Sequence, residues 1–212
     1  MSNLLTEVQI NSLEDMKGKK VVLGPIGQST YVFHEALLKG AGVLDDVDAI
    51  SMDTGAAAKA MLDGQVDVTF QAGGADGMGG YTPVPATMEL LNAGRKLHFV
   101  PFTAEDAKRA SEVVGYTIPF EEIKAKDLAE IQDVPVSSVL HPLVLSVDAS
   151  MDEDVVYEII RVIYENAEKF GEYDATGKSI TVEGLPKVPG AVKEDFHPGV
   201  LKFFEEKGIT ID

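Results

Sequence analysis

The chain has 212 residues, 45% of them hydrophobic, with no cysteine and a formal net charge of −17. These values suit one large or two small globular domains, exclude disulfides and cysteine chemistry, and argue against nucleic acid or an anionic membrane surface, since both need basic patches. No apolar run reaches the roughly 18 residues of a membrane span, and residues 1–7 show no secretory signal pattern.

Strand and helix signals alternate through the first two thirds of the chain. Apolar, strand-like runs lie at residues 20–23, 48–52, 66–70 and 97–102. Helical patterns lie at residues 31–39, 56–62, 85–92 and 103–114. Strands that alternate with helices predict parallel βαβ units, so the predicted fold class is α/β.

The last third of the chain has a different pattern. Strand signals at residues 134–147 are interrupted at 141–142, and a domain boundary is predicted near Asp133. Ser150 and Glu153 form a predicted capping box ahead of a helix. A loop is predicted at residues 184–190 and a short helix at 200–206. The helix after this capping box has a predicted apolar face, which consists of Val155, Val156, Ile159, Ile160, Ile163, Ala167 and Phe170.

Residues 19–31, KKVVLGPIGQSTY, predict a strand, a glycine turn and a helix that begins with hydroxyl residues. Free backbone N–H groups and the positive helix end then meet at one point, which suits an anion or a strong acceptor. The segment lacks the P-loop lysine and the G-x-G-x-x-G spacing. Capture of a ligand and an ordinary strand-to-helix turn are therefore equal alternatives.

A second candidate segment, residues 71–85, follows an apolar strand. Its glycines allow either close approach of the backbone to a ligand or an ordinary surface loop. Both candidate segments leave the carboxyl ends of strands, where open α/β sheets bind ligands. The glycines of this segment are Gly73, Gly74, Gly77, Gly79 and Gly80, and Tyr81 follows them.

The chain has four histidines that could be metal ligands or catalytic bases: His34, His98, His141 and His197. None has another histidine at metal-ligand spacing, so no metal site is expected. His197, which precedes a proline, is expected to cap or orient a turn.

Ser29 or Thr30 would be a nucleophile only if a base came close. His34, one turn along the same helix, is the candidate base, but no acid is placed to orient it. A small hydrolase is therefore the weaker alternative, and no catalytic residue or cofactor is assigned.

Several short motifs, taken in order, resemble TAXI-type solute receptors of TRAP transporters. The match extends over almost the whole chain, although each motif alone is short. The motifs are KGKKVVLG at 17–24 followed by Gly27, Thr30 and Tyr31, LDGQVD at 62–67, the pair Gly73-Gly74, TIP at 117–119, DVP at 133–135, and HPG at 197–199 followed by Phe203, Phe204 and Glu205.

The resemblance implies a type II periplasmic-binding-protein-like fold, in which two α/β lobes close over a small solute. It implies a receptor and not an enzyme, which binds an organic acid or an amino acid such as glutamate and delivers it to a TRAP membrane permease. A periplasmic location follows by resemblance; this chain shows no signal peptide, so a cytoplasmic location stays open.

The resemblance also implies the ligand-binding residues. Tyr81, which lies within the second segment, is added to this set from the interpretation of that segment and not from the resemblance. The positions are Gly27, Gln28, Ser29, Thr30 and Tyr31 from the first segment, and Gln71, Gly73, Gly74 and Tyr81 from the second.

The chain departs from the family pattern beside these positions. Ser29 replaces the third family glycine, and Gln28 stands where a serine is usual. Residues 75–82 resemble an insertion, and residues 120–124 replace a glycine- and tyrosine-containing turn. The ligand's identity therefore cannot be transferred.

By the same resemblance, residues 1–16 are a lead-in, 17–133 the complete second lobe, and 134–212 the C-terminal return of the first lobe. The N-terminal part of that first lobe is lacking. The chain is then a truncation, or it self-associates, or a separate chain covers the gap. Association is the working hypothesis, because exposed apolar surface and open strand edges are costly.

Arginine, the usual bidentate clamp for a carboxylate, occurs at Arg95, Arg109 and Arg161, and none of these positions suits a clamp. This half of the site is therefore expected to bind through backbone N–H groups and uncharged side chains. A further alternative is a receptor-like interaction module without a transport role.

Overall fold

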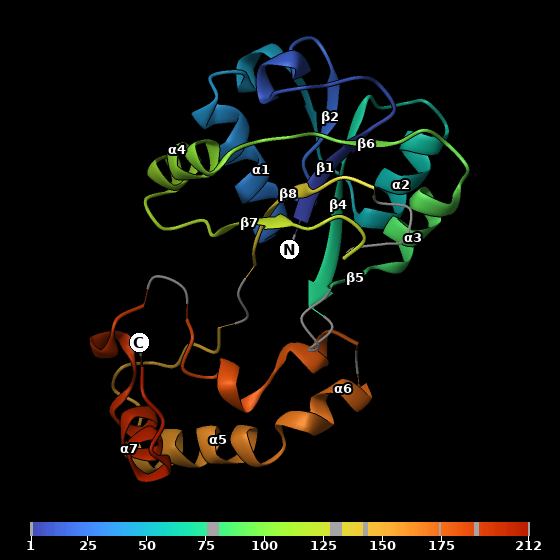
Figure 1. Cartoon of the computed structure of the whole chain (residues 1–212). Helices are drawn as coiled ribbons and strands as arrows, with labels where there is room; N and C mark the ends of the chain where they lie inside the picture. The colour runs from blue at the N-terminus through green and yellow to red at the C-terminus, as the bar shows by residue number, and fades with distance from the viewer. Residues whose placement is uncertain are drawn as a thin grey trace. The chain divides into compact units, whose positions relative to one another are not determined.

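The computed structural model describes residues 2–75, 81–127, 133–141, 144–173, 175–188 and 191–211. They form two compact units. The first contains the β-sheet and consists of the described residues up to Gly74 and from Tyr81 to His141; the second, from Val144 onward, is helical (Figure 1). The predicted division into lobes, with its change near Asp133, stays a prediction.

The sheet of the first unit is mixed. Its strand order is β3-β2-β4-β1-β8-β7, with β5 paired to β4 and β6 paired to β1. The described strands are β1 (Ser2–Thr6), β2 (Lys20–Val22), β3 (Asp48–Ile50), β4 (Val68–Ala75), β5 (Tyr81–Pro83), β6 (His98–Phe99), β7 (Phe120–Ile123) and β8 (Val136–Val139).

The predicted parallel pairing holds for β2 with β3 and β4, where Val21 pairs with Val68. The central strand β1 departs from it, because it runs antiparallel to β4, β6 and β8. Residues 1–16 were predicted as a lead-in without a strand. All five residues of β1 are nevertheless buried, including Ser2, Asn3 and Thr6.

Strand β4 runs further than the prediction of residues 66–70. It continues to Ala75, with β1 as an antiparallel partner as far as Ala72 and β5 also paired to it; Asn3 pairs with Gln71. Gln71, Gly73 and Gly74 are therefore strand residues and not part of a loop. Most of the predicted glycine loop, residues 76–80, lies outside the described residues.

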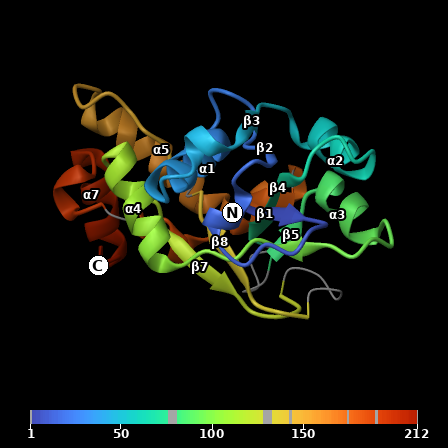
Figure 2. The same cartoon turned by 90° about the horizontal axis from the view of Figure 1, so that it is seen from above.

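The four predicted helices of the first unit are confirmed. They are α1 (Ser29–Gly40), α2 (Thr54–Leu62), α3 (Pro85–Asn92) and α4 (Ala104–Val114). Helices α1 and α4 pack together on one side of the sheet, and α2 and α3 on the other (Figures 1 and 2). Gly40 permits the first contact, because a Cβ there would lie 3.0 Å from the Ala110 backbone nitrogen.

The second unit is built on α5 (Glu153–Glu165), α6 (Phe170–Tyr173) and α7 (Pro198–Lys207). Phe203 of α7 is fully buried, and its ring meets those of Tyr157 and Tyr164 on α5 edge-on. Short 3-10 turns complete the described elements: η1 (Leu13–Met16), η2 (Leu44–Asp46), η3 (Ala167–Lys169), η4 (Ala175–Ser179), η5 (Val182–Gly184) and η6 (Lys193–Asp195).

Helix α5 begins and ends differently from the prediction. Its N-cap is Asp152, which accepts from the Asp154 and Val155 backbone N–H groups, whereas Ser150 bonds Asp148. The capping box assigned to Ser150 is therefore wrong. The carboxylate of Asp152, two residues later, caps the helix instead.

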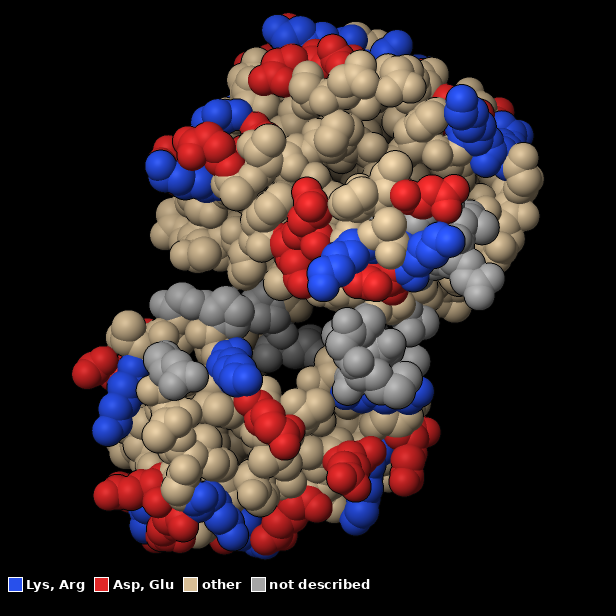
Figure 3. Space-filling view, in the orientation of Figure 1, with Lys and Arg blue, Asp and Glu red and all other residues tan. Residues whose placement is uncertain are grey.

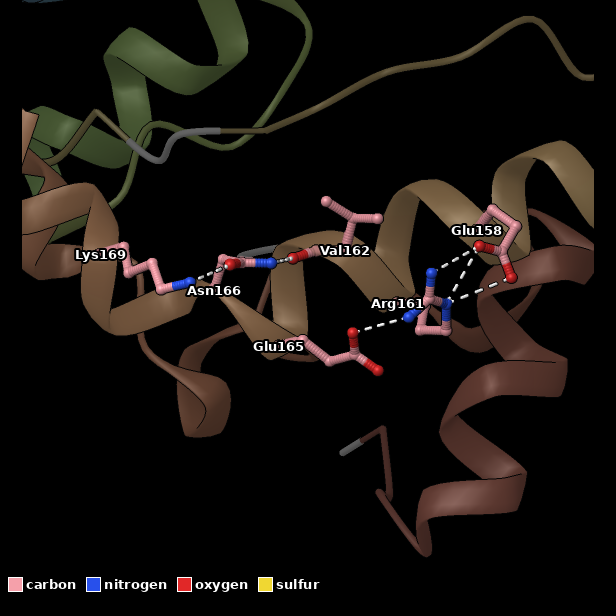
Figure 4. A network of polar contacts seen from close by, with 6 residues as sticks. All are labelled: Glu158, Arg161, Val162, Glu165, Asn166 and Lys169. Atoms are coloured by element: carbon pink, nitrogen blue, oxygen red, sulfur yellow. Dashed lines mark hydrogen bonds and ion pairs between the residues drawn. The ribbon is translucent and has the colours of Figure 1, made fainter.

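The predicted long helix ends at Glu165, because Asn166 leaves the helical conformation. The Asn166 amide donates to the Val162 carbonyl at 2.8 Å and accepts from Lys169 at 2.8 Å (Figure 4). One turn earlier, Arg161 is held between two glutamates of the same helix. The Nε and Nη2 atoms of Arg161 donate to Glu158, and its Nη1 donates to Glu165 (Figure 4).

Gly199 of α7 is predicted to be indispensable for the second unit. A Cβ there would lie 2.4 Å from the Glu153 carbonyl oxygen and 2.8 Å from the Tyr157 nitrogen, so Gly199→Ala must force α7 away from α5. We expect a loss of about 2 kcal/mol or more in the free energy of unfolding, measured in urea.

The matched control is Gly55→Ala, also at the second position of a helix. There the nearest atom is a flexible Asp53 oxygen at 3.5 Å, so a change between zero and a gain of about 1 kcal/mol is expected. Equal effects of the two substitutions would contradict the packing of α7 on α5.

Candidate functional site

The candidate site lies at one edge of the first unit's sheet. Strands β2 and β4 are parallel, and β8 runs in the same direction because both β4 and β8 are antiparallel to β1. Their carboxyl ends therefore meet at one edge, together with the start of β1. Open α/β sheets bind ligands at such an edge.

The turn after β2 leads directly into α1. Gly24 has φ +117, and a Cβ there would lie 3.1 Å from the Thr30 methyl and 3.2 Å from the Tyr31 nitrogen. Only glycine fits this turn without strain. Ile26 fixes the loop by donating its N–H to Ser51 Oγ at 3.1 Å.

Helix α1 begins with free donors. Gln28 is its N-cap in an extended conformation without a side-chain cap, and Val32 is the first residue whose N–H reaches back, to the Gln28 carbonyl. The backbone N–H groups of Ser29, Thr30 and Tyr31 have no hydrogen-bond partner among the described residues. The predicted cluster of donors at a positive helix end is thus formed by the fold.

A chain of hydrogen bonds continues from Ser29 into the interior. Ser29 Oγ lies 2.9 Å from His141 Nδ1, and His141 Nε2 lies 2.7 Å from Ser2 Oγ. Ser2 Oγ lies 3.2 Å from His34 Nε2, and His34 Nδ1 lies 3.0 Å from the Leu23 carbonyl oxygen. Four segments of the first unit therefore meet in one polar chain.

Both histidines of this chain are neutral near pH 7. Burial lowers the pKa of His34 to about 4, although its bond to the Leu23 carbonyl acts in the opposite direction. Burial likewise lowers the pKa of His141 to about 3, and its ring stacks against Phe33 with centroids 4.8 Å apart. Desolvation penalises the imidazolium form in both cases.

His34 is therefore wrong as the candidate base for Ser29. Its two ring nitrogens bond Ser2 and the Leu23 carbonyl, while the imidazole beside Ser29 belongs to His141. Sequence reasoning missed this role because His141 is 112 residues away along the chain, and its only local signal was the interruption of a strand pattern.

Gln71 is buried on the opposite face of β4. Ser2 and Phe70 face α1, where the Ser2 hydroxyl and the Phe70 ring both approach His34. Because side chains alternate along a strand, Gln71 and its neighbour Asn3 face the α2 and α3 side. Gln71 is 1% exposed, and neither of its amide atoms has a partner in the part of the chain that the structure describes.

The remaining predicted residues lie along β4 and β5. Gly73 and Gly74 follow Gln71 in β4, and Tyr81 begins β5. The Tyr81 hydroxyl donates to Glu121, and burial followed by this bond raises its pKa. The structure thus brings the two predicted segments to one sheet edge, but it gives the Gln71 and Ser29 side chains opposite faces.

All three arginines, none of which was predicted to clamp a ligand, form ion pairs with carboxylates. Arg95 pairs with Glu7, Arg109 with Asp106, and Arg161 with two glutamates of its own helix. On the face shown in Figure 3, acidic and basic side chains lie interspersed and not in separate patches.

The described residues lack two further kinds of feature. No group of three or more histidine, aspartate or glutamate side chains there could hold a metal ion. None of the helices in these ranges has the length and apolar character needed to cross a membrane. His197 caps α7 as predicted, because its Nδ1 accepts from the Gly199 N–H at 3.2 Å.

Comparison with known proteins identifies the family. A model of the NMT1-like family matches residues 2–208, so the chain belongs to the NMT1-like family. The family match covers nearly the whole chain, including both units.

Among solved structures, the chain is similar to three proteins. A putative periplasmic sulfonate-binding protein of an ABC transporter from Methylobacillus flagellatus is 20% identical over 47% of this chain and 27% of that chain, with a TM-score of 0.37. The periplasmic aliphatic sulphonate binding protein from Escherichia coli is 13% identical over 87% of this chain and 69% of that one, with a TM-score of 0.38. A protein from Archaeoglobus fulgidus is 18% identical over 98% and 67%, with a TM-score of 0.44.

The described helices and strands confirm the predicted α/β fold class. The chain spans about a quarter of the first of the three similar proteins.

The stability of the first unit is predicted to fall with acid because of His34. Its folded pKa of about 4 lies below the ordinary 6.5, so the stabilising effect is complete above pH 6.5 and is lost as pH falls toward 4, where the unfolded chain binds a proton that the folded chain does not. His34→Gln should weaken this pH dependence by on the order of 3 kcal/mol.

Urea unfolding of both proteins at several pH values between 7.5 and 4.5 measures this difference. Carboxylates titrate in both proteins, so the difference between the two curves isolates the histidine. Parallel curves would contradict the burial of a neutral His34.

Proposed function

We propose that the chain is the solute-binding subunit of a TRAP-type transporter, of the TAXI kind, which captures a small organic acid or an amino acid such as glutamate. Membership of the NMT1-like family and the resemblance in motif order support this assignment. On this proposal the protein works in the periplasm, delivers its solute to a membrane permease and needs no cofactor.

The observation that carries the proposal is the buried amide of Gln71. A buried amide without a partner costs about 1–3 kcal/mol, and Gln71 has two such atoms at the candidate edge. A buried polar group without a partner calls for an explanation, and a bound ligand is one. A polar solute that reaches the end of β4 would satisfy both the donor and the acceptor of this side chain.

The start of α1 supplies the second half of the proposed contact. Its free N–H groups suit the acidic group of a solute, and the net charge of −17 makes such short-range, aimed donors necessary. The proposed ligand contacts are the predicted positions Gly27, Gln28, Ser29, Thr30, Tyr31, Gln71, Gly73, Gly74 and Tyr81.

A hydrolase is not favoured by the geometry. Ser29 does contact an imidazole, but a general base works best with a pKa near the operating pH. Burial lowers the pKa of His141 to about 3, so this imidazole is too weak a base to remove the serine proton efficiently.

Replacement of Gln71 by leucine is predicted to increase stability and to abolish solute binding. Gln71→Leu removes two buried polar atoms that have no partner among the described residues, so we expect the free energy of unfolding to rise by about 1–3 kcal/mol. The same change should abolish the rise in melting temperature that a bound solute causes in the parent protein. Thermal melts with a panel of organic and amino acids measure both effects.

Thr87→Val is the matched control. This buried hydroxyl donates to the Ala72 carbonyl at 3.0 Å, so the same loss of polarity should destabilise the protein. A destabilised Gln71→Leu variant that binds solutes normally would contradict the proposed site.

The outer face of α5 is predicted to be covered in solution. Val155 and Val162 are 50% and 48% exposed on a groove that also includes Ile159 and Ile163. We propose that a second copy of the chain covers this face, because an exposed apolar patch is costly in water and Glu158, which also lines the groove, is already paired with Arg161.

Light scattering at micromolar concentration should give a mass of at least two chains. The double variant Val155→Glu, Val162→Glu should reduce it to one chain, whereas Val113→Glu on α4 should not. A clean monomer for the parent protein would contradict this part of the proposal.

A further inference from the structure

We infer that His141, Ser2 and His34 fix the direction of the Ser29 hydroxyl, so that Ser29 accepts a hydrogen bond from the solute and selects solutes with an O–H or N–H donor beside their acidic group. This inference rests on the proposed function for its ligand. The orientation of the hydroxyl follows from the protein alone.

The direction of the chain is set at its inner end. The Leu23 carbonyl can only accept, so His34 Nδ1 must carry a proton and donate to it at 3.0 Å. A neutral imidazole carries one ring proton, which leaves His34 Nε2 as an acceptor. Burial keeps this ring neutral. The Ser2 hydroxyl therefore donates to His34 Nε2.

The same reasoning extends outward to Ser29. Ser2 has used its single hydroxyl proton, so its oxygen accepts from His141 Nε2–H across 2.7 Å. His141 is neutral as well, so its Nδ1 is a bare acceptor. The Ser29 hydroxyl must then donate to His141 Nδ1 at 2.9 Å. Every proton in the chain has one position.

This arrangement decides what Ser29 offers to a ligand. The side chain is exposed at the first position of α1, and its proton is held by His141. Its remaining lone pairs can only accept. The neighbouring backbone N–H groups, by contrast, can only donate. A solute that contacts both must present an acceptor and, next to it, a donor.

The position of Ser2 makes the relay specific to this fold. Ser2 is fully buried at the start of β1, and its carbonyl accepts from Ser138 at 3.0 Å. The serine is thus fixed between the two imidazoles by strand pairing on both sides. His141, which follows β8, acts as a positioning residue and does not itself need to touch the solute.

Histidine NMR and calorimetry together test the inference. In the ¹⁵N-labelled full chain at pH 7, we expect His34 as the Nδ1–H tautomer and His141 as the Nε2–H tautomer. Binding is then measured with pairs of acids of equal charge that differ by one hydroxyl: 2-hydroxyglutarate and glutarate, lactate and propionate, and isethionate and ethanesulfonate.

In at least one pair, the hydroxy acid should bind about tenfold more tightly or better. Ser29→Ala should remove that difference, and His141→Phe should reduce it because the hydroxyl is then free to turn. Ser150→Ala, an exposed serine of the second unit, should leave it unchanged.

The opposite results overturn the inference. They are an Nδ1–H tautomer of His141, equal affinities within every pair that binds, or a preference that survives Ser29→Ala. If none of the six acids binds but other solutes raise the melting temperature, the inferred class of solute is wrong and the proposed function stands. If no solute of any kind binds, the proposed function fails, and the tautomers alone decide the direction of the Ser29 hydroxyl.

Discussion

The pairing of β1 between β4 and β8 is the constraint on which the rest of the first unit depends. Five buried residues at the start of the chain form an antiparallel strand in the middle of a sheet whose neighbouring strands run the other way. This pairing extends β4 beyond its apolar part, because Asn3 and Ser2 supply partners for Gln71 and Ala72. The same pairing brings the side chains of Ser2 and Gln71 to the edge where the parallel strands end.

The pairing of β1 places polar groups on both faces of the sheet. The groups on one face have hydrogen-bond partners, and the amide on the other has none among the described residues. On the α1 side, Ser2 completes a chain in which every hydroxyl and ring proton has an acceptor, and such networks rigidify a site. On the other side, Gln71 is buried without a partner among the described residues. The satisfied network orients Ser29, whereas the unsatisfied amide indicates where a ligand is needed.

The amino-acid pattern predicts those elements that local chemistry determines. Pro85 at a helix start, Thr103 with Asp106 in a capping box, and the glycine turn before α1 all carry their signal within a few residues. The sequence also predicts that β2 and β4 end at one edge, since that follows from βαβ geometry.

The remaining features depend on contacts between distant segments, which local patterns do not contain. Strand β1 was missed because Ser2, Asn3 and Thr6 are polar and yet buried, which contradicts the alternation expected of a strand. The pairing of Ser29 with His141 links residues 112 positions apart. The cap of α5 was misplaced because Ser150 and Asp152 both offer a capping oxygen, and only the path of the backbone decides between them.

The central claim is that a solute binds where β4 ends beside the start of α1. The most direct measurement follows the amide signals of the ¹⁵N-labelled full chain by NMR as small organic and amino acids are added. The account predicts that the side-chain amide of Gln71 and the backbone amides of Thr30 and Tyr31 shift together and saturate at the same concentration. Saturable shifts confined to other residues, with these three signals unmoved, would contradict it.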